Sequence, residues 1–246
     1  MEWRDQGIVL ARRHHGESAS IVSLLTRDHG RHLGLVRGGA GRRAAGLYQQ
    51  GNLVGAVWRG RLAEHLGSYA CEPMQSFAAR VMDDPLRLAA LMSACAIVEA
   101  ALPEREPHRS LHDATIELLN SLEGENWAAN YVRWECRCLA DLGFGLDLSR
   151  CAVTGEDNDL VYISPRSGRA VSREAGRPYA DRLFPLPEFL RGAGEGTATM
   201  ASILAGLEVT GHFLERNVLA AGDRAMPRPR TQLVDRLRRS VTMPRH

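Results

Sequence analysis

Five short strand-like stretches separated by turns fill the first seventy residues, and this pattern limits the fold more than any other feature of the chain. The stretches are rich in Val, Ile and Leu, and glycine-containing or polar turns lie between them at near-regular spacing. Such a pattern favours a small closed or partly open barrel, and at this length the oligonucleotide-binding (OB) barrel is the natural candidate. The expected strands cover residues 7–11, 19–26, 32–37, 53–58 and 61–70.

The pattern of apolar residues becomes helical after Pro73. Apolar side chains then recur at intervals of three and four residues, as they do on one face of an α-helix. Asp84 and Pro85 interrupt the first helical segment, as a helix start does. Helices are expected over residues 76–102, 110–122, 127–142 and from Thr197, as a helix cap, to Ala221.

Two further segments depart from the helical pattern. Residues 151–176 are irregular and strand-like, which predicts a small inserted module. Pro227 and Pro229 are expected to end the ordered part of the chain. The sequence therefore predicts an α+β fold with an N-terminal OB-fold β-barrel at 1–75, an all-α domain at 76–225 with an insert at about 149–178, and a basic, partly disordered tail at 226–246.

The composition indicates a water-soluble, cytoplasmic protein. No apolar run approaches the roughly 18 residues of a membrane span, and no apolar signal core follows the N-terminal Met1. The five cysteines are scattered, so we expect reduced thiols rather than a disulfide framework.

Charge is segregated along the chain although the net charge is only +2. Residues 1–70 carry a net charge of +5, residues 71–223 carry −9 and residues 224–246 carry +6. Such asymmetry indicates an anionic partner for the basic ends. All 31 basic side chains are Arg, so their placement is more informative than their identity.

Eight arginines of the expected barrel lie in or beside turns, where a groove could follow a phosphate backbone. Glycines at 38, 39 and 41 would let the chain approach DNA closely, whereas the alternative is a hairpin loop with solvated arginines. Few aromatic residues are available to stack on bases, and Trp58 suits the core equally well, so sequence-specific readout is not expected. The aromatics are Trp3, Tyr48, Trp58 and Tyr69. The expected DNA-binding residues are Arg12, Arg13, Arg31, Arg37, Arg42, Arg43, Arg59 and Arg61.

Several local strings occur in a recognisable order along most of the chain. They are Gly7-Ile8-Val9-Leu10, Gly16-Glu17-Ser18, Leu24 to Gly30, the glycine and arginine segment 38–43, Leu146 to Cys151 and Ser164 to Val171. Their order and spacing resemble those of the bacterial RecO family of DNA repair and recombination mediators.

The resemblance implies a protein of the RecF recombination pathway that binds single- and double-stranded DNA non-specifically and anneals complementary strands. It further implies help in loading RecA onto DNA coated by single-strand binding protein, with RecR as a direct partner and RecA as an indirect one. The expected location is the cytoplasm, at the nucleoid. A pocket of apolar side chains with a basic rim is implied for the acidic, aromatic-ended tail of single-strand binding protein, without an assignment to residues.

The family's zinc-ribbon-like insert is expected in a degenerate form. The corners that would bear the metal ligands are Cys151, Thr154, Ser172 and Ala175. Only the first can provide a thiolate or an imidazole, whereas a structural zinc site needs four good ligands, so no metal is expected. Two other groups are rejected as ligands: Cys136 and Cys138 point to different faces of a helix, and Asp28, His29 and His32 are read as a solvated polar turn.

The sequence lacks three common enzyme signatures. The lysine-free chain has no phosphate-binding loop of the Gly-Lys-Ser/Thr type, no Gly-x-Ser-x-Gly turn and no His-Glu-x-x-His helix. We therefore expect a binding protein with no catalytic residues and no cofactor. One alternative is an RNA-binding OB-fold protein. Another is a small hydrolase, whose first sign would be a cleft with His108 or His112 beside Asp113. The arginine-rich tail is either solvated or a second DNA contact.

Overall fold

The computed structural model describes residues 1–39, 41–191 and 198–242, and the chain divides into two compact units. The first unit comprises Met1–Glu123 and Pro227–Arg230, and the second comprises Gly124–Met226 and Thr231–His246. This division differs from the expected boundary at residue 75, because the helices that follow the barrel pack and hydrogen-bond with it.

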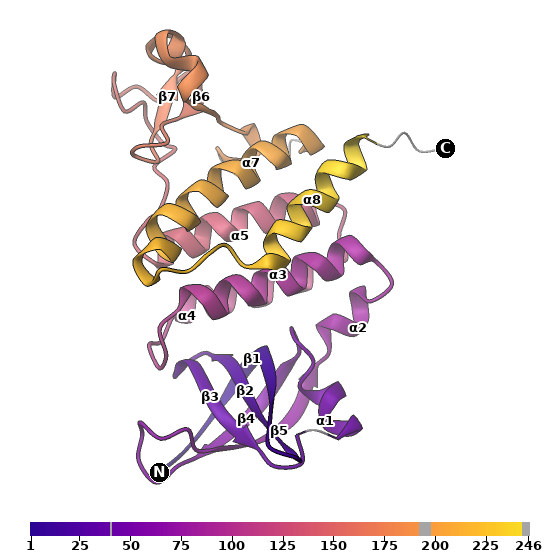
Figure 1. The fold of residues 1–246 in the computed structure, drawn as a ribbon. Helices are drawn as coiled ribbons and strands as arrows, with labels where there is room; N and C mark the ends of the chain where they lie inside the picture. Colours follow the sequence, from indigo (N-terminus) through magenta and orange to yellow (C-terminus); the bar gives the residue numbers. More distant parts are fainter. Residues whose placement is uncertain (40, 192–197, 243–246) are drawn as a thin grey trace. The chain divides into compact units, whose positions relative to one another are not determined.

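The first unit begins with a closed five-stranded barrel, which confirms the expected OB-type domain (Figure 1). Its strand order is β1-β2-β3-β5-β4, with β3 and β5 parallel and the other pairs antiparallel. Helix α1 (Arg42–Leu47) lies between β3 and β4 along the chain. The strands are β1 (Glu2–His15), β2 (Ala19–Thr26), β3 (Gly30–Val36), β4 (Leu53–Arg59) and β5 (Ser68–Gln75).

Strand β1 is longer than expected because two neighbours share it. Its first half pairs with β4 and its second half with β2, and the register shifts between Val9 and Ala11. Residues 61–67, which were expected to be strand, form most of the β4–β5 loop instead. Gly60 and Gly67 lie against the Trp58 indole, where an added Cβ would be 2.3–2.4 Å from ring atoms, so this loop is folded tightly over the barrel.

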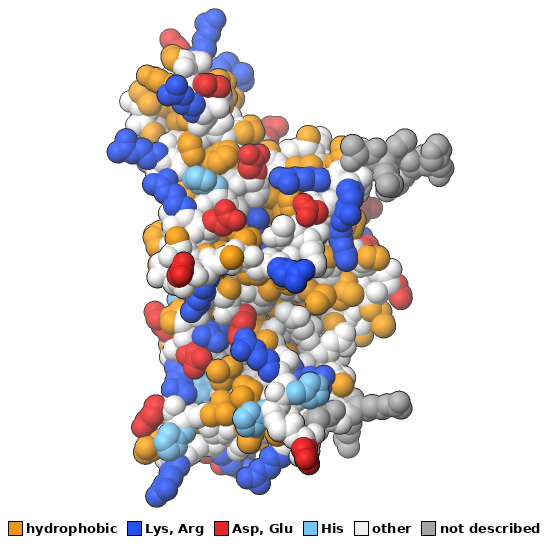
Figure 2. All heavy atoms as spheres, in the orientation of Figure 1, with side chains coloured by type: hydrophobic (Ala, Val, Ile, Leu, Met, Phe, Trp, Pro, Cys, Tyr) orange, Lys and Arg blue, Asp and Glu red, His pale blue; other side chains and the backbone are white. Residues whose placement is uncertain are grey.

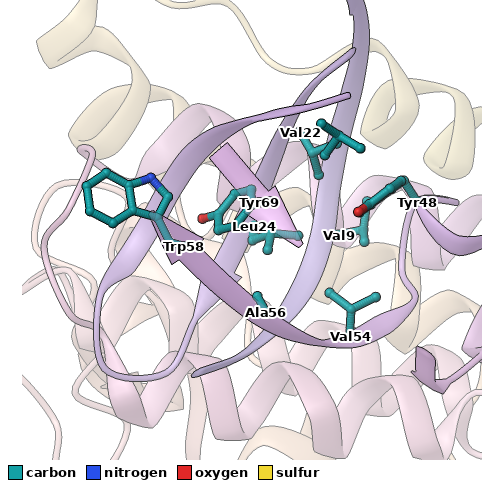
Figure 3. Packing of buried hydrophobic residues seen from close by; sticks show 9 residues of the cluster. Val9, Val22, Leu24, Tyr48, Val54, Ala56, Trp58 and Tyr69 are labelled. Carbon is teal, nitrogen blue, oxygen red and sulfur yellow. The ribbon is translucent and has the colours of Figure 1, made fainter. Parts of the chain in front are cut away.

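The barrel interior is filled by alternate side chains of the strands. Val54, Ala56 and Trp58 point inward from β4, as the period of two in a strand requires. Figure 3 shows this cluster with Trp58 and Tyr48 at opposite sides of the view. The buried members are Val9, Val22, Leu24, Val36, Tyr48, Val54, Ala56, Trp58 and Tyr69.

Three helices complete the first unit: α2 (Phe77–Val81), α3 (Pro85–Ala101) and α4 (Arg109–Ser121). Helix α3 begins where the sequence predicted a restart. The Asp84 carboxylate accepts hydrogen bonds from the backbone N–H groups of Leu86 and Arg87, and Pro85 occupies the first helical position. Helix α3 contacts β1.

The second unit contains helices α5 (Trp127–Asp141) and α7 (Met200–Phe213), which pack against each other. The Thr210 hydroxyl donates to the carboxylate of Glu135 within this buried contact. The expected cap, Thr197, lies outside the described residues, and Thr199 caps α7 by accepting from the Ser202 N–H at 3.2 Å. A π-helix (Leu214–Leu219) and a 3-10 helix (Ala220–Gly222) follow α7.

The insert forms a three-stranded sheet in the order β7-β6-β8. The strands confirm the strand-like segment expected from the sequence, but the structure does not show that the insert is a zinc ribbon. The elements are β6 (Leu160–Ile163), β7 (Ala170–Ser172), α6 (Arg173–Gly176), β8 (Phe184–Pro185) and two 3-10 helices (Arg177–Arg182 and Glu188–Leu190).

The prediction that the chain loses order after Pro229 is wrong. Helix α8 spans Arg228–Thr242. A proline is tolerated in the first turn of a helix because its missing N–H has no intrahelical partner there. Leu233, Val234 and Leu237 are buried along one side of α8, and this apolar stripe stabilises the helix. No helix among the described residues is long and apolar enough to cross a membrane.

Candidate nucleic-acid interface

One end of the barrel brings together two basic segments that are separate in the sequence. The β1–β2 hairpin tip and the loop after β3 are neighbours, because Ser20 pairs with both His14 and Val36. The Arg12 guanidinium donates to the Gly39 carbonyl at 3.1 Å and so links the two segments. Arg37 is exposed and has no ion pair with any described residue. The side chains of Arg42 and Arg43 lie outside the described part of the structure.

The loop between β3 and α1 has the conformation that its glycines permit. Gly38 has a φ of 67°, in the left-handed region that favours glycine. At Gly39 an added Cβ would lie 2.9 Å from the Ser20 Cβ. This loop therefore lies directly on β2, with Arg37 exposed at its start. In Figure 2, arginine and histidine side chains gather over the barrel in the lower part of the view.

The expected arginines at the end of β4 differ from each other. The Arg59 Nε donates to the Glu2 carboxylate at 2.8 Å, and this contact lowers the pKa of Glu2. Arg61 is exposed in the β4–β5 loop and has no ion pair among the described residues. Arg61 is thus open to an anionic ligand, whereas Arg59 would have to share its charge with Glu2.

Arg31 is not a surface residue, which corrects its assignment as a DNA-binding residue. It is 9% exposed, its Nε donates to the Leu102 carbonyl at 2.9 Å, and its guanidinium lies 3.6 Å from the carboxylates of Glu99 and Glu104. Glu99 also accepts a hydrogen bond from the Ser23 hydroxyl at 2.5 Å. Arg31 therefore ties the outer face of the barrel to α3.

Arg13 reaches the same carboxylate from β1. Its guanidinium lies 3.8 Å from Glu99, but its side chain is 77% exposed. The pair is therefore weak, and Arg13 remains able to contact an anion from solvent. The described arginines among the eight expected ones thus fall into three groups. Arg12 and Arg37 lie at one loop, and Arg13 and Arg61 are exposed. Arg31 and Arg59 are paired with acidic side chains.

The aromatic residues of the barrel do not form a base-stacking surface. Tyr48, Trp58 and Tyr69 are buried in the core. Trp3 is partly buried and stacks on the His29 ring, with the ring centroids 4.0 Å apart. This arrangement agrees with contacts to the DNA backbone rather than to bases.

The polar turn after β2 is a hydrogen-bonded structure rather than a cluster of ligands. The Asp5 carboxylate accepts from the Asp28 N–H at 2.8 Å and contacts the His29 Nδ1 at 3.0 Å. His32 is buried and hydrogen-bonds to Tyr69 at 3.1 Å. Burial, with the nearby charge of Arg105, lowers the pKa of His32 to about 4. No group of three or more metal-binding side chains occurs among the residues that the structure describes.

Three of the four corner positions in the insert lie together but do not fit zinc. The Cys151 sulfur lies 3.4 Å from the Ser172 hydroxyl and accepts from the Ser172 N–H at 3.3 Å. Burial raises the pKa of Cys151, but hydrogen bonds from Ser172 and Thr154 outweigh this effect and lower the pKa to about 6. Thr154 and Ser172 offer only hydroxyls, and the fourth corner is Ala175. Cys151 is therefore the one good zinc ligand at these corners, where a structural site needs four.

The second unit has a pocket of about 370 Å³ whose residues were not predicted from the sequence. One face of α5 supplies Arg133, Cys136 and Ala140, whose spacing of three and four residues was visible in the sequence. The Arg133 guanidinium lies 5.3 Å from the centre of the Phe189 ring and donates to the Phe189 carbonyl at 3.3 Å. The remaining lining residues are Leu146, Leu148, Phe189 and Leu190. The pocket is therefore apolar with one cationic group.

The histidine beside Asp113 is not arranged for hydrolysis. His112 is completely buried, so its ring cannot reach a substrate. Asp113 receives two hydrogen bonds of 3.0 Å from Arg27, and these, with a contact to His112, lower the pKa of Asp113 to about 2. The Arg27–Asp113 pair joins the β2–β3 turn to α4.

Comparisons with known proteins identify the same family over most of the chain. A family model described as "Recombination protein O N terminal" matches residues 1–77, and one described as "Recombination protein O C terminal" matches residues 82–224. The chain is 53% identical to the DNA repair protein RecO of Rhodospirillum centenum, over 98% of this chain and 97% of that protein. It is 52% identical to the RecO of Rhodospirillum rubrum, over 97% of each chain. It is 48% identical to a RecO of Cereibacter sphaeroides, over 97% of this chain and 99% of that protein.

Proposed function

The chain belongs to the RecO family of DNA repair proteins, and on that premise we propose that it is a recombination mediator of the RecF pathway. It binds single- and double-stranded DNA without sequence preference and anneals complementary strands. With RecR, it helps to load RecA onto DNA coated by single-strand binding protein. It does this in the cytoplasm, at the nucleoid, without a catalytic residue or a cofactor.

The main support for DNA binding is a set of arginines in two loops of the barrel. Arg12 and Arg37 lie at a glycine loop that is pressed onto β2, and Arg61 is exposed in the β4–β5 loop. In OB folds the β1–β2 and β4–β5 loops flank the oligonucleotide. Because the aromatic side chains are in the core, the attraction is mainly to phosphate groups.

A fluorescence anisotropy titration with single-stranded DNA tests this proposal. If about four phosphates are neutralised, log affinity falls against log salt with a slope of about −3. The double variant Arg37→Ala/Arg61→Ala should make the slope less steep. The control is Arg80→Gln on α2, which removes an arginine paired with Glu123 and should leave the slope unchanged. If unlabelled RNA displaced the labelled DNA at a lower concentration than unlabelled DNA does, the result would instead favour an RNA-binding protein.

The pocket beside Arg133 suits the tail of single-strand binding protein. Its apolar walls can hold a C-terminal aromatic side chain, and the Arg133 guanidinium can meet the terminal carboxylate. We therefore include this contact in the proposal, with Leu148 as one wall of the pocket.

A labelled synthetic peptide with acidic residues and a C-terminal phenylalanine tests the pocket. Arg133→Ala and Leu148→Ala should each weaken peptide binding to the full chain, and Arg137→Ala, on the same helix but outside the pocket lining, should not. Equal binding by all variants would place the peptide elsewhere. A pull-down with purified single-strand binding protein and RecR tests the two partners themselves.

A further inference from the structure

Arg105 has a backbone conformation that side chains other than glycine rarely adopt. It lies between α3 and α4 with a φ of 64°. Among the described residues, the other non-glycine residues with positive φ are Asp159 and Asp223, and aspartate tolerates this region better than arginine does. Strain of this kind persists where the surrounding structure enforces it, and it often marks a functional position.

The segment around Arg105 is fastened to the edge of β3. The Arg105 N–H donates to the Arg31 carbonyl at 2.8 Å, and Arg31 in turn holds the Leu102 carbonyl and the Glu104 carboxylate. The backbone of Glu106 passes so close to Gly30 that an added Cβ there would be 2.0 Å from its carbonyl oxygen. The position of Arg105 is therefore fixed by the barrel.

The side chain of Arg105 reaches the β4–β5 loop. Its Nη2 donates to the His65 carbonyl at 3.2 Å. Other anchors of this loop come from the barrel strands and the N-terminus. The Trp58 Nε1 donates to the Leu66 carbonyl at 3.0 Å, the Leu35 N–H donates to the Gly67 carbonyl at 3.1 Å, and the Gly60 N–H donates to the Met1 carbonyl at 3.1 Å. Arg105 thus adds a contact from the α3–α4 segment to a loop that carries the exposed Arg61.

We propose that Arg105 is a positioning residue for DNA binding, which holds the β4–β5 loop in the conformation that receives the strand. This inference rests on the proposed function, because it assumes that the β4–β5 loop grips DNA as it does in other OB folds. A loop that is ordered before binding loses less conformational entropy when the ligand arrives. The strained backbone directs the guanidinium at the loop, and the α3–α4 segment thereby affects the affinity of the barrel.

The variant Arg105→Gly separates the backbone from the side chain. Glycine adopts a positive φ readily, so the fold is kept while the contact to His65 is removed. We expect about fivefold weaker binding of single-stranded DNA, the value of one lost hydrogen bond. We also expect faster hydrogen exchange of the amides in residues 61–66 and an unchanged slope of log affinity against log salt.

Arg109→Ala is the matched control, because it removes a nearby arginine that pairs with Asp28 at 2.7 Å and does not hold the loop. It should bind DNA as the wild type does. A slope less steep by about 0.7 in Arg105→Gly would show direct phosphate contact and overturn a positioning role. Unchanged affinity and exchange, or equal losses in both variants, would also overturn it. A wild type that does not bind DNA would refute the proposed function, and loop exchange in Arg105→Gly would still decide whether Arg105 holds the loop.

Discussion

Two arginines that lie six positions apart should respond in opposite ways to substitution. Arg31 on β3 is 9% exposed and lies between the carboxylates of Glu99 and Glu104, whereas Arg37, directly after the same strand, is exposed. Arg31→Met should therefore reduce stability and leave the salt dependence of DNA binding unchanged. Arg37→Ala should leave stability unchanged and reduce the salt dependence.

The magnitudes follow from burial and geometry. Breaking a buried ion pair costs about 3–5 kcal/mol, but both contacts of Arg31 are 3.6 Å long and the Glu104 side chain is 39% exposed, so we expect about 2–3 kcal/mol. For a chain of this length that loss lowers the melting temperature by about 5–10 °C. Removal of Arg37 should change stability by less than about 0.5 kcal/mol and the salt slope by about 0.7.

Thermal unfolding followed by circular dichroism, together with DNA titrations at several salt concentrations, measures both quantities. In the double variant Arg31→Met/Glu99→Gln part of the lost stability should return, because a neutral amide replaces the carboxylate that has lost the Arg31 cation. A normal melting temperature for Arg31→Met together with a less steep salt slope would refute the structural role assigned to Arg31.

Three further outcomes are expected. Asp113→Asn should lower stability at pH 7 by less than about 1 kcal/mol, since the pair with Arg27 is half exposed. Because the pKa of Asp113 is lowered to about 2, its contribution is present above pH 4 and lost as the pH falls through about 2, which unfolding measured against pH will show. Metal analysis after chelation should find no stoichiometric zinc, and one equivalent that is lost on Cys151→Ser would contradict this. Arg236→Gln with Arg239→Gln, on the exposed side of α8, should reduce strand annealing more than binding of a short oligonucleotide, and equal losses would mean that α8 holds no second strand.

The barrel was predictable because short-range sequence patterns determine its strands and turns. Alternating apolar residues and glycine turns specify strands, and the Asp84–Pro85 pair specifies the start of α3. Helix α8 was missed because Pro227 and Pro229 were read as a stop, although a proline in a first helical turn starts a helix equally well.

The candidate site was only partly predictable because it depends on contacts between distant segments. Nothing local to Arg31 indicates that Glu99 will cover it, since alternation along a strand identifies the outward side chains but not the helix that packs on them. Arg37 and Arg61 could be found because loop arginines near glycines are exposed in most settings. The pocket beside Arg133 needed Phe189, which only the folded chain brings to α5.

The placement of the tryptophans gives each compact unit its own optical probe. Trp3 and Trp58 lie in the barrel unit, and Trp127 and Trp134 lie on α5 in the other. Trp58 and Trp134 are almost completely buried, so their emission should shift when their surroundings open to water. Replacing both tryptophans of one unit by phenylalanine would leave tryptophan fluorescence from the other unit alone. Two such chains, melted side by side, would tell whether the halves of the molecule unfold together or in succession.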